Sequence, residues 1–138
     1  MRTKYKAWDG KKWHTEGVFV SHDGVVWHRP RGQREMRKVD WLVVWWTGLK
    51  DKNGVEIYEG DFIANINNRL NFRQVFHVKE WFKCELIGEE GYDLPRTRLA
   101  GFTLTPDFHD STGTLDINNL LVIGNAHEHP HLINNKQL

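Results

Sequence analysis

The sequence has almost no cysteine, no long apolar run and no apolar segment near its start. Its one cysteine, Cys84, excludes an internal disulfide and a zinc site built from several cysteines. No run approaches the roughly 18–20 apolar residues of a membrane helix, and the basic start lacks the apolar stretch of a secretory signal. These absences predict a protein of a reducing cytoplasm, where disulfides are rare.

Regular helical periodicity is also scarce, which favours strands. Short apolar runs are separated by glycine-containing turns such as Asp9-Gly10, Asp23-Gly24 and Asn53-Gly54, a pattern typical of all-β proteins. We therefore predict short antiparallel strands around a partly closed, barrel-like core. The exception is a short helical turn expected near the C-terminus, where Pro130 suits the first turn of a helix.

The length of 138 residues corresponds to about one domain. We predict a single domain over 1–138. Within it, an N-terminal β subdomain is expected over 1–40, and a core carrying the signature described below is expected over 41–133.

Tryptophan is abundant and unevenly placed: six of the seven lie in the first 46 residues. The segment 41–47 is apolar on both alternating faces, which predicts a strand covered on both sides. Trp45 is the ring most open to further contact. We expect either another subunit or chain, or the basic loop before this strand, to cover it, and we predict a homo-oligomer.

Charge is also uneven, although the net charge is only +1. Residues 1–50 hold eleven Lys and Arg against five Asp and Glu, whereas residues 51–138 hold eight against thirteen. This asymmetry indicates either an anionic partner or two faces that neutralise each other within or between subunits.

The strongest binding candidate is a basic loop over 29–38, in which Glu35 is the only acidic residue. Its cations are Arg29, Arg31, Arg34, Arg37 and Lys38. Trp27 and Trp41 flank the loop, and cations beside aromatic rings suit single-stranded nucleic acid through phosphate contacts and base stacking. A contact with another protein and a plainly solvated loop are the alternatives.

Two further groups have the residue types of a chemical site. His127, His129 and His131 alternate near the C-terminus, a spacing that suits a divalent metal on an extended segment; the alternative is a solvated loop. Cys84 and His77 have the types of a nucleophile and base, but a lone cysteine is more often a small buried apolar residue. No cofactor is expected.

The segment 47–61 predicts a compact β-corner. Asn53-Gly54 and Gly60-Asp61 are tight-turn sequences, and only residues 56–58 between them have room to form a strand. Four acidic residues gather here: Asp51, Glu56, Glu59 and Asp61. Such a group suits acid–base chemistry or a hard cation, or else hydrogen bonds to the backbone of the turns themselves.

This segment resembles the signature of the YopX family, small proteins found mostly in phages and prophages. The opening Lys6-Ala7-Trp8-Asp9 and the segment 122–132 resemble the family's ends, although the three C-terminal histidines have no counterpart there. The signature residues are Gly48, Leu49, Asp51, Asn53, Gly54, Ile57, Tyr58, Gly60, Asp61, Gly124 and Asn125. The resemblance implies a family-specific all-β fold, a phage or prophage origin and no assigned activity.

Together these features predict a non-catalytic, oligomeric protein-interaction module acting in the bacterial cytoplasm on a phage or host protein. The first alternative is a nucleic-acid-binding accessory protein that uses the basic loop. The second is a small enzyme that uses the acidic corner.

Overall fold

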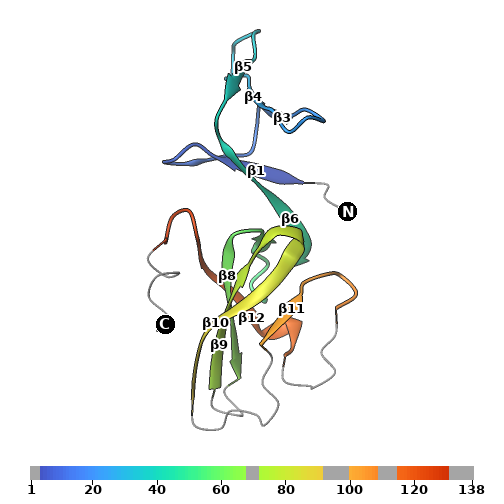
Figure 1. Ribbon diagram of the computed structural model, residues 1–138, viewed down its shortest axis with the longest axis vertical. Coiled ribbons are helices and arrows are strands. Elements are labelled where there is room, and N and C mark those ends of the chain that lie inside the picture. Colours follow the sequence, from blue (N-terminus) through green and yellow to red (C-terminus); the bar gives the residue numbers. More distant parts are fainter. Residues whose placement is uncertain (1–3, 68–71, 92–99, 109–114, 131–138) are drawn as a thin grey trace. The chain divides into compact units, whose positions relative to one another are not determined.

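The structure is a computed structural model that describes residues 4–67, 72–91, 100–108 and 115–130 (Figure 1). The chain divides into two compact units, Met1–Trp45 and Trp46–Leu138, called unit 1 and unit 2 below. The division falls inside strand β6 (Leu42–Lys50), whereas the sequence pattern placed it near residue 40.

The predicted all-β class is confirmed. The described residues form antiparallel strands, with two short 3-10 turns, η1 (Glu80–Phe82) and η2 (Ile117–Asn119). Neither turn, nor any other part of the described chain, supplies a helix long and apolar enough to cross a membrane.

Unit 1 contains two small sheets. One joins β2 (Trp13–His14), β1 (Tyr5–Trp8) and the first half of β6. The other joins β3 (Val18–Val20), β4 (Val26–His28) and β5 (Arg37–Val39). The Tyr5 hydroxyl donates to the Val18 carbonyl oxygen at 2.7 Å and so links the two sheets.

The tryptophans of unit 1 are half-buried rather than central. Its buried apolar residues are small, namely Ala7, Val18 and Val44. The ring centroids of Trp8 and Trp13 lie 5.0 Å apart, as do those of Tyr5 and Trp45. Trp45 is thus covered in part by Tyr5 of the neighbouring strand, a ring that the sequence pattern did not suggest.

Unit 2 is built on a five-stranded sheet in the order β11-β10-β9-β8-β12 (Figure 1). Its strands are β8 (Asp61–Asn67), β9 (Phe72–Val78), β10 (Lys83–Gly91), β11 (Gly101–Thr103) and β12 (Leu120–Asn125). The second half of β6 pairs separately with β7 (Glu56–Tyr58).

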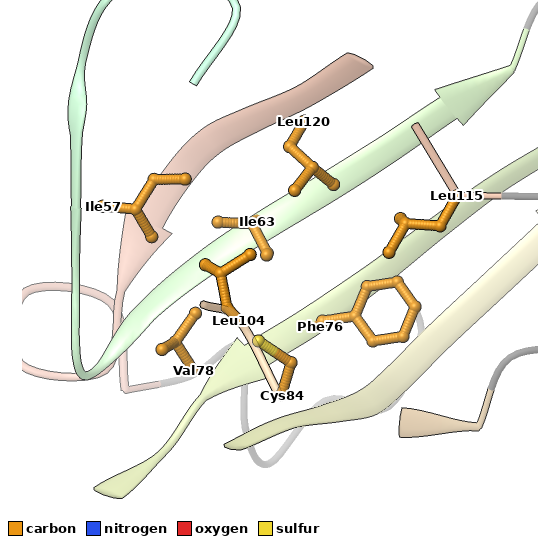
Figure 2. Close-up of a cluster of buried hydrophobic side chains, with 8 residues drawn as sticks. All are labelled: Ile57, Ile63, Phe76, Val78, Cys84, Leu104, Leu115 and Leu120. Carbon is orange, nitrogen blue, oxygen red and sulfur yellow. The ribbon is translucent and has the colours of Figure 1, made fainter. Parts of the chain in front are cut away.

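The core of unit 2 lies on both faces of this sheet. On one face eight buried residues form a cluster, drawn in Figure 2: Ile57, Ile63, Phe76, Val78, Cys84, Leu104, Leu115 and Leu120. On the other face Phe62, Ala64 and Val75 form a second cluster. Because neighbours along a strand point to opposite faces, β8 supplies both clusters and is buried on both sides.

The sheets remain open, and no closed barrel occurs among the described residues. Closure would require the edge strands β11 and β12 to pair. The β12 edge is instead occupied by the signature corner, because the Lys52 N–H donates to the Leu120 carbonyl oxygen at 3.0 Å and the Val122 N–H donates to Asp51 Oδ2 at 3.0 Å.

The signature corner therefore holds the C-terminal strand in place. Asp51 also accepts hydrogen bonds from the N–H groups of Asn53 and Val55, and the Ala126 N–H donates to the Gly60 carbonyl oxygen at 2.8 Å. Gly60 has φ +91° and lies against the His127 ring, so a side chain there meets both backbone strain and a clash.

The β9–β10 connection has a strained backbone. Trp81 and Phe82 have φ values of 59° and 64°, which residues other than glycine adopt at a cost. Glu59 Oε2 accepts from the Trp81 N–H at 2.8 Å, and Phe82 packs against the core, whereas the Trp81 side chain is 64% exposed. A carboxylate of the signature thus fixes this turn.

The predicted C-terminal helical turn lies mainly in 131–138, outside the described residues. Within the described part, residues 126–128 form a turn in which Asn125 Oδ1 accepts from the N–H groups of His127 and Glu128.

Candidate functional site

An open cleft of about 740 Å³ lies in unit 1, between the residues that follow β1 and the start of the basic loop. Its charged and titratable lining residues are Lys12, His14, Glu16, His28, Arg29 and Arg31. Three of them are permanent cations and one is a carboxylate. This excess of positive charge favours an anionic ligand.

Two histidines, His14 and His28, line the cleft, and both pack on Trp41. The His14 ring stacks on Trp41 with centroids 4.3 Å apart and planes 20° apart. The His28 ring lies 4.5 Å from Trp41 and 5.3 Å from His14. The three rings therefore hold one another in position, and the two imidazoles stay at the cleft.

Asp9 orients the His14 ring. Asp9 Oδ2 lies 2.8 Å from His14 Nε2, and Oδ1 accepts from the N–H groups of Lys11 and Lys12. These hydrogen bonds, first that from His14, hold the pKa of the Asp9 carboxyl well below its usual range. Because an ionised carboxylate only accepts, Nε2 carries the proton of this pair.

His28 is held in its neutral form. Burial lowers its pKa, and the positive charges of His14, Arg37 and Lys12 lower it further. Its Nδ1 is buried and has no hydrogen-bond partner within the described part of the chain. The permanent charge of the cleft therefore comes from its lysine and arginines rather than from His28.

The structure separates the five cations of the predicted basic loop, because only some of them line the cleft. Arg29 and Arg31 line the cleft, and Arg34 is exposed. Arg37 and Lys38 belong to strand β5 and not to the loop, which is therefore shorter than predicted. Arg37 pairs with His28 and Lys38 with Trp27, so the two cations lie on opposite faces of the sheet. Trp45 contacts Tyr5 on the neighbouring strand.

Sequence reasoning missed Lys12, His14 and Glu16. The Asp9-Gly10 turn was the available signal, because a tight turn there reverses the chain and lays residues 13–14 beside β1, as the pairing of His14 with Ala7 shows. The segment after this turn lies beside the basic loop because of contacts between the two sheets. No local sequence pattern reveals those contacts.

The predicted metal ligands have structural contacts where the structure describes them. The His127 ring covers Gly60, and the His129 ring covers Gly124. His129 Nδ1 also accepts from the Asn125 N–H at 3.2 Å. His131 lies outside the described residues. Within those residues, no three His, Cys, Asp or Glu side chains gather as metal ligands would.

The acidic corner directs its carboxylates at backbone donors. Asp51, Glu59 and Asp61 are buried, and Asp61 Oδ2 accepts from the Tyr58 N–H at 2.8 Å. Glu56 accepts from the Tyr58 hydroxyl at 3.3 Å. Burial and the nearby Glu56 charge raise the pKa of Tyr58 to about 12. This geometry favours turn chemistry over acid–base catalysis.

Cys84 and His77 do not form a nucleophile–base pair. Cys84 pairs with Val78 and His77 with Glu85, so the thiol and the imidazole lie on opposite faces of the sheet. Burial raises the pKa of the Cys84 thiol to about 12, which leaves it protonated and unreactive.

A family model described as YopX protein matches residues 4–134. The chain belongs to the YopX family. The resemblance inferred from the signature is thereby confirmed, and it extends through the middle of the chain. YopX is a family of uncharacterised function, so membership assigns no activity. No curated protein matches the sequence.

Two solved structures resemble the chain over nearly its whole length. Protein yopX from Bacillus subtilis has a TM-score of 0.61 at 16% identity, covering 96% of this chain and 97% of that chain. Protein EF1440 from Enterococcus faecalis has 23% identity and a TM-score of 0.48, covering 94% and 96%. The likeness to the Bacillus subtilis protein shows that the two chains share the YopX fold.

Proposed function

We propose that this chain is a non-catalytic binding protein, and that unit 1 holds the phosphate backbone of nucleic acid in its basic cleft. The observation that supports this most directly is the convergence of Lys12, Arg29 and Arg31 on one cleft whose only acidic lining residue, within the described chain, is Glu16. Lysine and arginine supply most of the affinity in phosphate contacts.

The two imidazoles of the cleft fit the same function. The His14 and His28 rings line the cleft beside its cations, and neutral His28 adds no further charge there. Since Trp41 fixes both rings, the cleft is ordered before a ligand arrives, which reduces the entropy lost on binding.

The proposal is tested by fluorescence anisotropy with a labelled single-stranded DNA at several salt concentrations. Each phosphate contact contributes about 0.7 to the slope of log affinity against log salt. Replacing Lys12, Arg29 and Arg31 together by alanine is therefore expected to lower that slope by about 2. The matched control replaces Lys50, Lys52 and Lys83, three exposed lysines of unit 2, and should leave the slope unchanged.

Two outcomes overturn this proposal. One is the absence of binding by the wild-type protein at low salt. The other is an equal loss of affinity in the cleft variant and the control, which would indicate a non-specific effect of net charge. Binding of polyglutamate in place of DNA would assign the cleft to an acidic protein segment.

Self-association is a second candidate function, favoured by the charges of the two units. Unit 1 holds ten Lys and Arg against five Asp and Glu, and unit 2 holds nine against thirteen. Opposite net charges of +5 and −4 would attract unit 1 of one copy to unit 2 of another. Light scattering that returns only the 16.3 kDa monomer at micromolar concentration would contradict it.

A phage or prophage origin and a cytoplasmic location stay predictions from the sequence.

A further inference from the structure

One face of the sheet β3–β4–β5 combines aromatic rings with cations. Phe19 pairs directly with Trp27, and Trp27 pairs directly with Lys38. Directly opposed residues of antiparallel strands share a face. Phe19, Trp27 and Lys38 therefore form a row across all three strands.

Arg29 completes this row. Its guanidinium carbon lies 5.6 Å from the centroid of the Phe19 ring, within the range of a cation–π contact. We call the four residues Phe19, Trp27, Arg29 and Lys38 the stacking face. Phe19 is 40% exposed, Arg29 and Lys38 are exposed, and Trp27 is half-buried.

The stacking face differs from the other aromatic groups of unit 1. Trp8 packs on Trp13, Tyr5 packs on Trp45, and Trp41 lies between two imidazoles. Those rings are used to hold the unit together. Phe19 instead lies on the short edge strand β3 and presents a large part of its ring to solvent.

The nearby acidic group is hydrogen-bonded within its own turn. Asp23 lies close enough to Lys38 for the lysine to contribute to the lowered pKa of its carboxyl. The carboxylate accepts hydrogen bonds from the Ser21 hydroxyl and the Val25 N–H within its own turn, and the Ser21 hydrogen bond is the main cause of that lowered pKa. Asp23 is thus engaged by the β3–β4 turn.

Flat rings beside cations are the parts from which single-strand binding surfaces are made. A base stacks on an aromatic ring while a neighbouring lysine or arginine contacts the adjoining phosphate. A duplex already stacks its bases on one another, so it gains nothing from such a surface. Arg29 both lines the basic cleft and lies over Phe19, and so connects the stacking face to the phosphate-binding cations.

We propose that the stacking face binds unpaired bases and makes unit 1 selective for single-stranded nucleic acid. This inference rests on the proposed function, because the cleft supplies the phosphate contacts beside which the bases stack. It assigns Phe19 as the principal stacking residue and Trp27 as its neighbour on the central strand.

The test compares two labelled single strands of the same length, about 12 nucleotides, which lies within the ~4–16 nucleotides that a small binding surface covers. One is oligothymidylate and the other has abasic sugars throughout. The two strands carry the same phosphates and differ only in the bases. We expect the wild-type protein to bind oligothymidylate about tenfold more tightly than the abasic strand, since stacking of one base contributes about fivefold or more.

Substitutions of Phe19 then test whether its ring causes the preference for the strand that carries bases. Phe19→Leu keeps an apolar side chain and removes the flat ring, so it should bind both strands with the affinity of the abasic strand and an unchanged salt slope. Phe19→Tyr keeps the ring and should retain the preference. Far-UV circular dichroism of both variants checks that the small sheet is intact.

The outcomes separate this inference from the proposed function. Equal, salt-dependent binding of both strands by the wild-type protein would overturn the stacking face and leave the cleft as a phosphate site. A base preference that persists in Phe19→Leu would also overturn it. Failure of the wild-type protein to bind either strand would overturn both proposals.

Discussion

In unit 2, eight buried apolar residues fill one face of a five-stranded sheet and three more fill the other. In the described part of unit 1, by contrast, the buried apolar residues are only Ala7, Val18 and Val44. Yet unit 1 has five of the seven tryptophans. Its rings pack in pairs at half-buried positions instead of forming a centre. The tryptophan-rich part of the chain is therefore the part with the smaller core, and its aromatic side chains remain close to the surface.

This difference matches the distribution of candidate sites. In unit 2 the polar residues of the signature are committed to backbone groups, as Asp51 and Asp61 illustrate. In unit 1 the cations and rings face a cleft and a sheet face. We infer that unit 2 provides stability and that unit 1 provides binding, and the following experiments test that contrast.

The largest effect is expected from removing a core ring of unit 2. Phe76 is fully buried between β8 and β10, so Phe76→Ala should lower the free energy of unfolding by about 3–5 kcal/mol. Val44→Ala in unit 1 should cost about 2 kcal/mol, because fewer methyl groups leave a smaller cavity. Urea denaturation followed by circular dichroism measures both, and equal losses would contradict the difference between the two cores.

The next effect concerns Asp51, whose buried carboxylate accepts three backbone hydrogen bonds. Asp51→Ala leaves these donors unsatisfied and should cost about 3 kcal/mol or more. Asp116→Ala, the control, removes one exposed cap of η2 and should cost about 1 kcal/mol. Similar losses in urea denaturation would show that Asp51 does not hold the C-terminal strand.

The pH dependence of stability gives a second test of Asp51. Burial raises the pKa of its carboxyl, but the hydrogen bonds from Val122, Val55 and Asn53 outweigh burial, so the pKa in the folded protein is lowered. The stability from this group is therefore complete above the unfolded pKa of about 4 and is lost as the pH falls below it. Asp51→Asn should flatten this acid limb of the stability curve measured by urea denaturation.

A smaller effect is expected at Trp41, the ring on which the two cleft histidines pack. Trp41→Ala removes the ring between His14 and His28 and should cost about 2 kcal/mol, while Trp41→Phe should retain most of the stability. The proton NMR signals of the His14 ring should lose their ring-current shift in the alanine variant alone. Unchanged His14 signals would contradict the stack.

The smallest effect is expected at the strained turn. Trp81 has φ 59° and an exposed side chain, so Trp81→Gly should be more stable than Trp81→Ala by about 1 kcal/mol. At Lys79, with φ −97°, the order should reverse, since alanine is favoured over glycine at ordinary backbone angles. Thermal denaturation of the four variants provides the comparison, and the same order at both positions would contradict backbone strain at Trp81.

Local patterns predicted most of the strands and turns. Asn53-Gly54 and Gly60-Asp61 form turns because their chemistry depends on a few neighbouring residues. The prediction for β5 was wrong, because Arg37 and Lys38 have loop composition but gain hydrogen bonds from β4, a partner set by the tertiary fold. The Asp51–Val122 hydrogen bond spans 71 positions, which is beyond any local pattern.

The sequence by itself determined the all-β class, the family and the accumulation of cations and tryptophans in the first third of the chain. These follow from residue types and from spacings within a turn or a strand. Only the tertiary structure decided that Lys12 and His14 meet Arg29 and Arg31 at one cleft and that Arg37 and Lys38 face opposite ways. It also decided that Phe19 remains exposed while most tryptophans of unit 1 pack on other rings. The physical reason is that these placements depend on which strands pair and how two small sheets pack, and those choices minimise the free energy of the whole unit rather than of any one segment.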